Sequence, residues 1–341
     1  MRIGVLTGGG DSPGCNAVLY GILKRAQVSS HEVIAFLEGW KGVLDGRTRP
    51  LSLEEVKDYF DVGGTLIGTS RTNPFKIDDG PQRCIRNLQE NKIDALITIG
   101  GDDTNGVGFK LSSLGAKVVG VPQTIDNDLS ATEYAVGFDS ALNTVAESLD
   151  RLRTTARSHK RILVCEIMGR DAGWLCLYGG IAGRADIVLL PEDEVNLDEV
   201  CERAKMAYES SQGYALVAVA EGVIPKGMSA QVVQEASVDA FGHVRLGGIG
   251  NLLAKEIETK TGIETRVVIL GHLQRGGKPT AMERLYGVLL GVKAVELCEK
   301  GDFGNLVGII GGVPTPVPLS AAVSQIRKIP GELLELTKFL K

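Results

Sequence analysis

Short apolar runs that are rich in β-branched residues recur along the chain and predict buried strands. They fall at residues 2–7, 32–37, 94–99, 117–121, 161–167, 186–190, 214–220, 265–270 and 306–310. Most are separated by segments with a helical period, at residues 15–27, 81–90, 105–114, 139–156, 172–183, 196–210, 247–260 and 280–299. Such alternation is typical of βαβ crossovers, so the pattern predicts an α/β fold with parallel sheets covered by helices.

Nine predicted strands in 341 residues fit two sheets better than one. We expect two Rossmann-like three-layer α/β/α domains with mostly parallel sheets. The chain would cross between them near Gly137 and again after Gly277. The predicted first domain comprises residues 1–137 plus 278–325, and the second comprises residues 138–277 plus 326–341.

Composition narrows the class of protein. Glycine makes up 44 of the 341 residues, and its clusters follow apolar strands, as tight strand-to-helix turns require. The net charge of −5 is spread over interspersed acids and bases, which gives no indication of a nucleic-acid or membrane surface. Six scattered cysteines without a CxxC pair argue against disulfides and zinc. With no signal sequence or bilayer-length apolar run, we expect a cytoplasmic protein.

Ligands of open α/β sheets bind where strands end, so the loops there carry the candidate chemistry. The loop Thr7–Gly14 contains three consecutive glycines before a predicted helix, an arrangement that can expose backbone N–H groups to a phosphate. It matches neither the Walker nor the GxGxxG pattern, and tight-turn geometry explains it equally well. In the loop Gly63–Arg71, Arg71 follows small residues. Its side chain could extend into a cleft, or it could be a solvent-exposed loop arginine.

The segment Gly100-Gly101-Asp102-Asp103-Thr104 follows strand 94–99 at the expected start of a helix. Asp102 and Thr104 could hold Mg²⁺ or its waters, and the helix N-terminus favours phosphate. Both residue types also cap helices well, which is the alternative interpretation. Asp103 adds a second negative charge where a phosphate chain would lie.

Two carboxylates stand close together in Thr124-Ile125-Asp126-Asn127-Asp128, after strand 117–121. Close carboxylates are unfavourable unless a metal or hydrogen-bond donors compensate. One of them could accept a proton from a substrate hydroxyl while the other faces a metal ion. An Asx-rich turn is the competing interpretation.

Basic residues gather near later strand ends. Arg170, in Met168-Gly169-Arg170, could neutralise charge on a transferring phosphoryl group. A second basic set suits a sugar-phosphate monoester and consists of Arg161, Arg266, His272 and Arg275. Surface ion pairing is the alternative for each of them. Glu221, after strand 214–220, could accept hydrogen bonds from sugar hydroxyls or be an ordinary loop acid.

Taken together and in this order, these loops resemble the phosphofructokinase family over nearly the whole chain. The Gly-Gly-Asp loop is shared with NAD kinases and lipid kinases. The combination of Thr124–Asp128 with Gly271-His272-Leu273-Gln274-Arg275-Gly276-Gly277 is far more specific. The resemblance implies the phosphofructokinase fold and a magnesium-dependent transfer to the 1-hydroxyl of fructose 6-phosphate, a step of glycolysis.

The resemblance also implies residue roles. Asp126 would be the base, with Thr124 and Arg170 stabilising the transferring group, and Asp102 and Asp128 would serve Mg²⁺. The implied donor-binding residues are Gly10, Arg71, Asp103, Thr104 and Gln123. The implied fructose 6-phosphate residues are Thr124, Asp126, Asp128, Arg161, Met168, Gly169, Arg170, Glu221, Arg266, His272 and Arg275. In the family the matches of Arg161 and Arg266 come from a neighbouring subunit, which implies a homodimer or homotetramer.

Asp103 indicates the phosphate donor. ATP-using members similar to this chain carry glycine there, whereas pyrophosphate-using members carry aspartate. An aspartate would fill the space of the ATP α-phosphate and repel its charge. Pyrophosphate users typically carry lysine at position 123, where this chain has Gln123. Because exclusion is harder to undo than one lost attraction, we predict a pyrophosphate-dependent enzyme.

The ATP-dependent reaction is the close alternative. A non-catalytic sugar-phosphate-binding subunit is a remote one. Such a subunit should have lost its base or metal carboxylates, yet Asp102, Asp126 and Asp128 are all present.

Overall fold

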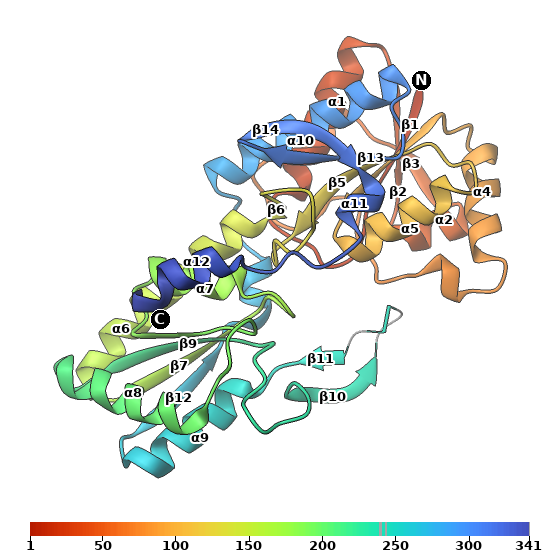
Figure 1. The fold of residues 1–341 in the computed structure, drawn as a ribbon. Coiled ribbons are helices and arrows are strands. Elements are labelled where there is room, and N and C mark those ends of the chain that lie inside the picture. Colours follow the sequence, from red (N-terminus) through yellow and green to blue (C-terminus); the bar gives the residue numbers. More distant parts are fainter. Residues whose placement is uncertain (239–240, 243, 341) are drawn as a thin grey trace.

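Two sheets, each flanked by helices, organise the computed structural model of the protein (Figure 1). The structure describes residues 1–238, 241–242 and 244–340. Residue 341, the last of the predicted second domain, therefore lies outside the described residues. Within this part of the chain, no helix combines the length and apolar character needed to cross a membrane.

The larger sheet contains the N-terminal strands and two strands from late in the chain. Its order is β14-β13-β5-β4-β1-β2-β3, with β6 beside β5. Its strands are β1 (Arg2–Thr7), β2 (Glu32–Phe36), β3 (Thr48–Pro50), β4 (Ala95–Gly100), β5 (Val118–Thr124), β6 (Val136–Gly137), β13 (Asn305–Ile310) and β14 (Val313–Pro318). All pairs are parallel except β2–β3 and β13–β14.

The smaller sheet is entirely parallel, in the order β12-β7-β9-β8. Its strands are β7 (Ile162–Ile167), β8 (Ile187–Leu189), β9 (Ala215–Ala220) and β12 (Thr265–Ile269). A hairpin of β10 (Val233–Val238) and β11 (Val244–Leu246) stands apart from both sheets (Figure 1).

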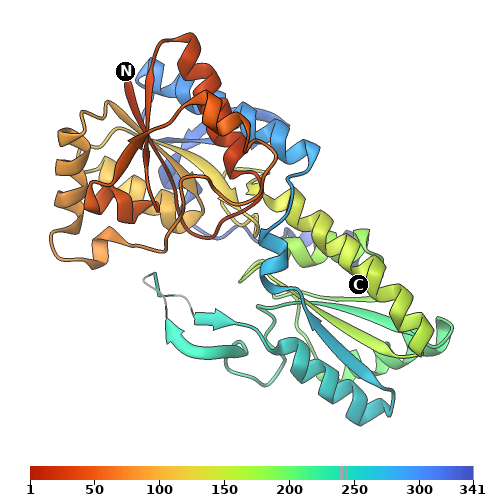
Figure 2. The same cartoon turned by 180° about the vertical axis from the view of Figure 1, so that it is seen from behind.

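Helices cover both sheets. Those around the larger sheet are α1 (Cys15–Val28), α2 (Trp40–Asp45), α3 (Leu53–Lys57), α4 (Gly80–Glu90), α5 (Asp102–Ser112), α10 (Ala281–Lys300) and α11 (Leu319–Ala322). Those around the smaller sheet are α6 (Phe138–His159), α7 (Trp174–Ala182), α8 (Leu197–Ser210), α9 (Ile249–Thr261) and α12 (Gly331–Thr337). Short 3₁₀ turns are η1 (Pro74–Lys76), η2 (Gly271–Arg275) and η3 (Lys338–Leu340). Seen from behind, α6 runs from the junction along the smaller sheet (Figure 2).

Burial in the core explains why the sequences of the central strands are continuous apolar runs. Every residue of β4, β5, β7 and β9 is buried, because helices exclude water from both faces of each sheet. Six free cysteines are all buried, which agrees with the absence of a disulfide pattern in the sequence.

A buried carboxylate holds the junction between the two sheets. Glu283, on α10, accepts hydrogen bonds from the backbone N–H groups of Gly137 and Ser140 at 2.7 and 3.0 Å. The hydroxyl of Tyr134 donates to it at 2.5 Å. Burial raises the pKa of Glu283, although these donors oppose the shift. The start of α10 is thereby fixed to the start of α6, where the chain passes from the larger sheet to the smaller one.

The structure confirms the predicted α/β class with mostly parallel sheets, and the predicted helices and strands are present. Two boundaries near the candidate site differ. Helix α5 begins at Asp102 and not at 105, so the carboxylates and Thr104 lie in its first turn. Strand β5 continues to Thr124, so Gln123 and Thr124 are strand residues. The exact domain limits remain a proposed division.

Candidate active site

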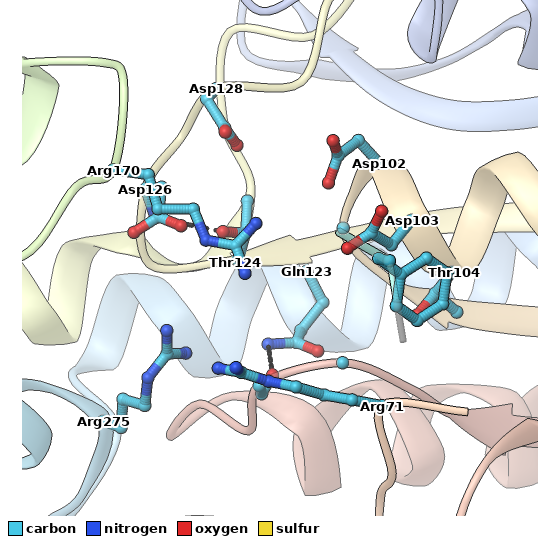
Figure 3. Close-up of a pocket in the computed structure, with 14 residues that line it drawn as sticks. Arg71, Asp102, Asp103, Thr104, Gln123, Thr124, Asp126, Asp128, Arg170 and Arg275 are labelled. Carbon is cyan, nitrogen blue, oxygen red and sulfur yellow. Dashed lines mark hydrogen bonds between the residues drawn. The ribbon is translucent and has the colours of Figure 1, made fainter. Parts of the chain in front are cut away.

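One pocket collects most of the predicted site residues at the carboxyl ends of β1, β4, β5 and β7 (Figure 3). Residues from both sheets line it, because Arg170 follows β7 of the smaller sheet. The lining residues are Gly9, Gly10, Arg71, Gly101, Asp102, Asp103, Thr104, Gln123, Thr124, Asp126, Asp128, Arg170, Phe241 and Arg275.

The first turn of α5 forms one wall. Asp102, Asp103 and Thr104 supply two carboxylates at a helix end whose leading N–H groups have no partner within the helix. Thr104 is buried, and its Oγ1 would lie 2.6 Å from a Cβ atom placed on Gly8. Glycine at position 8 therefore lets the β1 loop approach α5 closely.

The glycine loop after β1 forms a second wall. The hydroxyl of Thr69 donates to the carbonyl of Gly9 at 2.7 Å, which ties the loop carrying Arg71 to this wall. A Cβ atom on Gly10 would lie 2.3 Å from Arg275 Nη1, so a side chain here would displace Arg275. Arg275 itself donates to the carbonyl of Asp11 at 3.3 Å. This arginine, expected only near the sugar phosphate, therefore also contacts the predicted donor loop.

Gln123 is buried next to the same loop. Its Nε2 donates to the carbonyl of Gly10 at 3.0 Å (Figure 3). An amide has two N–H donors, so one remains after this bond. Gln123 thus supports the glycine loop by a neutral hydrogen bond.

The loop after β5 holds two buried carboxylates. Asp126 is 5% exposed, and its Oδ1 has no hydrogen-bond partner in the part of the chain that the structure describes. The N–H of Asp126 donates to Thr124 Oγ1 at 3.1 Å, which fixes the turn. Burial, followed by the charges of Asp126 and Asp102, raises the pKa of Asp128 well above its ordinary value. The pocket therefore concentrates negative charge that a cation would relieve.

Arg170 provides positive charge opposite these carboxylates (Figure 3). Burial alone would lower the pKa of its guanidinium, but the charges of four carboxylates, with Asp126 and Asp102 contributing most, outweigh burial and raise it. Arg170 has a φ of +51°, an unusual backbone conformation for this residue type. Strain of this kind persists where surrounding contacts fix it, and it is frequent at functional sites.

Glu221 contributes to fixing the Arg170 loop. Its Oε1 accepts from the N–H groups of Gly169 at 3.4 Å and Arg170 at 3.2 Å. Burial, followed by the charge of Asp126, raises the pKa of Glu221 to about 7. The N–H of Met168 donates to Gln274 Oε1 at 3.3 Å. Met168, Gly169 and Glu221 therefore border the pocket residue Arg170, although none of the three lines the pocket.

The acidic wall fits magnesium. No group of three or more His, Cys, Asp or Glu side chains within the described part of the chain is arranged to bind a metal by itself. Mg²⁺ typically takes one or two carboxylates and completes its shell with water and substrate phosphate. Asp102 and Asp128, both in the pocket, meet that requirement.

Arg161 and Arg266 do not line the pocket, unlike Arg170 and Arg275. Arg161 precedes β7 and Arg266 is the second residue of β12, so both lie at the amino ends of these strands. They pair with Glu264 Oε1 at 3.3 and 2.8 Å. Within one chain, Arg161 and Arg266 therefore form ion pairs, as the alternative interpretation predicted. His272, on η2, is exposed and does not line the pocket.

Phe241 lines the pocket but was not predicted from the sequence. It is carried between β10 and β11 and is partly buried against the apolar cluster around Trp40. No motif marks it, because the hairpin is an excursion between β9 and α9 whose reach across the molecule depends on the tertiary fold.

Helix N–H groups, carboxylates and arginines meet between two α/β units, and these are the groups with which phosphotransferases surround phosphate and a cation. Residues 2–298 match the family model described as Phosphofructokinase. The chain belongs to the phosphofructokinase family, which confirms the resemblance seen in the sequence.

Relatives that use different donors are similar to this chain. It is 50% identical to the pyrophosphate–fructose 6-phosphate 1-phosphotransferase of Dictyoglomus thermophilum, covering 99% of this chain and 98% of the relative. It is 42% identical to ATP-dependent 6-phosphofructokinase 3 of Streptomyces coelicolor, covering 97% of each. The solved pyrophosphate-dependent phosphofructokinase of Marinobacter aquaeolei is 21% identical, with a TM-score of 0.85 over 100% of this chain and 91% of that one, and supports the fold.

Proposed function

We propose that the protein transfers a phosphoryl group reversibly from pyrophosphate to the 1-hydroxyl of fructose 6-phosphate. The products are fructose 1,6-bisphosphate and phosphate. One observation carries the proposal: a buried carboxylate oxygen of Asp126 has no hydrogen-bond partner among the described residues, in a pocket that also holds Arg170 and three further carboxylates. Such an oxygen is suited to accept the proton of a bound hydroxyl.

In the forward direction the 1-hydroxyl oxygen bonds to a pyrophosphate phosphorus while its proton passes to Asp126. The bond from that phosphorus to the bridging oxygen breaks, and phosphate leaves. Arg170 and Thr124 stabilise the charge on the transferring group. Gly10, Arg71 and Thr104 bind the donor, and Met168, Gly169, Glu221, His272 and Arg275 bind the sugar phosphate. Asp102 and Asp128 would hold Mg²⁺, which supplies charge neutralisation when bound.

The donor assignment depends on Asp103. Its position in the first turn of α5, on the pocket wall, supports exclusion of a third phosphate. Two like charges about 4 Å apart repel by about 4 kcal/mol at an effective dielectric constant near 20. Gln123 contributes no positive charge, but its bond to Gly10 supports the donor loop. The name of the Dictyoglomus thermophilum relative favours the same donor.

The working form would be a cytoplasmic homodimer or homotetramer. Arg161 and Arg266 lie away from the pocket of their own chain, which supports a role in the site of a neighbouring subunit. The acidic wall of the pocket, together with the chain's negative net charge, gives no reason to expect a nucleic acid or a membrane as partner.

A donor comparison tests the proposal. Purified protein with Mg²⁺ and fructose 6-phosphate should form fructose 1,6-bisphosphate with pyrophosphate and far less with ATP. Turnover with ATP alone would refute the donor assignment. Sugar-phosphate binding without turnover on either donor would favour a non-catalytic subunit.

The base is tested by Asp126→Asn, which keeps the size of the side chain but cannot take up the proton. We expect kcat to fall by about 10³-fold while the dissociation constant for fructose 6-phosphate changes by less than about threefold. Asp171→Asn is the matched control, because Asp171 is an exposed carboxylate beside Arg170 that does not line the pocket. A near-normal rate for Asp126→Asn would remove Asp126 from the base role.

A further inference from the structure

The C-terminal segment runs antiparallel to the loop that carries the proposed base. Leu129 and Ile326 form an isolated antiparallel bridge. Beside it, the hydroxyl of Ser130 donates to the carbonyl of Gln325 at 2.6 Å. The N–H of Arg327 donates to the carbonyl of Asp128 at 2.7 Å. A segment about 200 positions later in the chain therefore holds the loop next to its catalytic residues.

The side chain of Arg327 contacts the same loop. Its Nε and Nη2 both donate to the carbonyl of Asn127, at 3.2 and 2.9 Å. Nη2 also lies 3.3 Å from the carbonyl of Glu133, which accepts a bond from Asn127 Nδ2 at 3.2 Å. One guanidinium thus fixes the peptide between Asn127 and Asp128, and the rigid fork of arginine suits this task.

This peptide needs external support, because Asn127 has a φ of +52°. Asparagine tolerates the left-handed region better than most residues, yet the conformation persists only where neighbouring contacts determine it. Asp126 and Asp128 stand on either side of Asn127. A rotation of this peptide would therefore turn the proposed base and the proposed metal carboxylate relative to each other.

Contacts with Trp174 and Glu192 hold Arg327 and its neighbours in place. Its guanidinium carbon lies 4.1 Å from the centroid of the Trp174 ring, a cation–π contact. Trp174 Nε1 donates back to the carbonyl of Arg327 at 2.7 Å. Two residues later, the N–H of Ile329 points to Glu192 Oε1 at 3.4 Å. These contacts come from the smaller sheet's side, so they anchor the β5 loop of one sheet to the helices of the other.

We propose that Arg327 is a positioning residue for phosphoryl transfer, whose guanidinium sets the relative orientation of Asp126 and Asp128 through the carbonyl of Asn127. This inference rests on the proposed reaction. It locates part of the catalytic geometry in the C-terminal segment, whose described residues do not line the pocket. Because the arginine acts on alignment and not on the sugar contacts, its loss should affect kcat more than substrate affinity.

Arg327→Met tests this inference by removing the fork and the charge while keeping much of the bulk. We expect kcat with pyrophosphate to fall by about 100-fold, the effect of a small misalignment of reacting groups. The KM and the calorimetric dissociation constant for fructose 6-phosphate should change by less than about threefold. Arg327→Lys keeps the charge without the fork, so it should lose about tenfold in kcat.

Chemical rescue separates positioning from general destabilisation. Added guanidinium should restore part of the kcat of Arg327→Ala by occupying the space over Trp174, whereas urea at the same concentration should not. Lys328→Met is the matched control, because it removes a positive charge from the adjacent exposed residue and should leave kcat unchanged. If Arg327→Met does not fold, Trp174→Phe provides the second test, since it loses the bond to the Arg327 carbonyl and should lower kcat severalfold.

Failure of the positioning role and failure of the proposed reaction would give different experimental results. Normal kcat in Arg327→Met, or an equal loss of kcat and sugar affinity without rescue by guanidinium, would overturn the positioning role. An unsubstituted protein that turns over neither donor would instead overturn the proposed reaction itself.

Discussion

At the scale of single residues, Asp103 is the side chain on which the proposed choice of donor depends. Because Asp103 lies in the first turn of α5, both the volume and the negative charge of its side chain are at the pocket wall. Asp103→Gly should raise kcat/KM for ATP by at least about tenfold, because relief of even a third of the estimated repulsion has that effect. Initial rates with both donors, at fixed Mg²⁺ and fructose 6-phosphate, measure the change.

Asp103→Asn separates the two contributions, since it keeps the volume and removes the charge. If charge dominates, this variant should gain ATP activity almost as Asp103→Gly does, whereas if volume dominates it should resemble the unsubstituted protein. Unchanged discrimination between donors in both variants would remove Asp103 from the donor role.

Glu221 carries a pH-dependent destabilisation. Burial raises its pKa in the folded protein from 4.5 to about 7, so the folded state favours the neutral acid. Ionisation therefore destabilises the fold progressively as pH rises from 4.5 to about 7, and the cost is complete above that range. A shift of this size corresponds to a cost on the order of 3 kcal/mol.

Glu221→Gln should remove this cost and still accept the N–H groups of Gly169 and Arg170. We expect the variant to exceed the unsubstituted protein in free energy of unfolding at pH 8 and to match it near pH 4. Urea unfolding at both pH values measures the difference. Glu202→Gln, an exposed change on α8, should show no such pH-dependent gain, and an equal gain there would contradict the assignment.

At the scale of elements, the sequence was most informative where burial imposes a long pattern. Strands β4 and β7 are buried on both faces, and the long helices α6 and α10 contain several turns, so their positions could be predicted closely. Helices α2 and α3 contain only six and five residues, too few to show a period. The hairpin of β10 and β11 pairs with neither sheet, and its strands were not among those predicted from the sequence.

The residues of the candidate site likewise fall into those that the sequence could place and those that it could not. Loops that directly follow parallel strands could be placed together, because the carboxyl ends of β1, β4, β5 and β7 meet at the pocket. Arg161 and Arg266 were grouped with His272 by residue type, although they lie at the start of their strands and therefore at the other edge. Phe241 and Arg327 depend on chain segments that meet only in the folded protein, and no local pattern marks either residue.

At the scale of the whole molecule, the position of Arg161 and Arg266 raises the question of which subunit they serve. Both pair with Glu264, and about half of the Arg266 side chain remains exposed at 53%. Exposed ion pairs stabilise a chain little, so these arginines remain available to a phosphate brought by a neighbouring subunit. A site completed by a second copy would make activity a property of the oligomer.

Subunit mixing tests this arrangement. One variant carries Asp126→Asn, and the other carries Arg161→Ala with Arg266→Ala; each alone should have little activity. In a dimer with shared sites, a hybrid regains one intact site, because one subunit supplies Asp126 and the other supplies both arginines. Random pairing should restore about a quarter of the normal activity. Hybrids isolated by two affinity tags that remain inactive, or an arginine double variant with normal KM for fructose 6-phosphate, would show that each chain works alone.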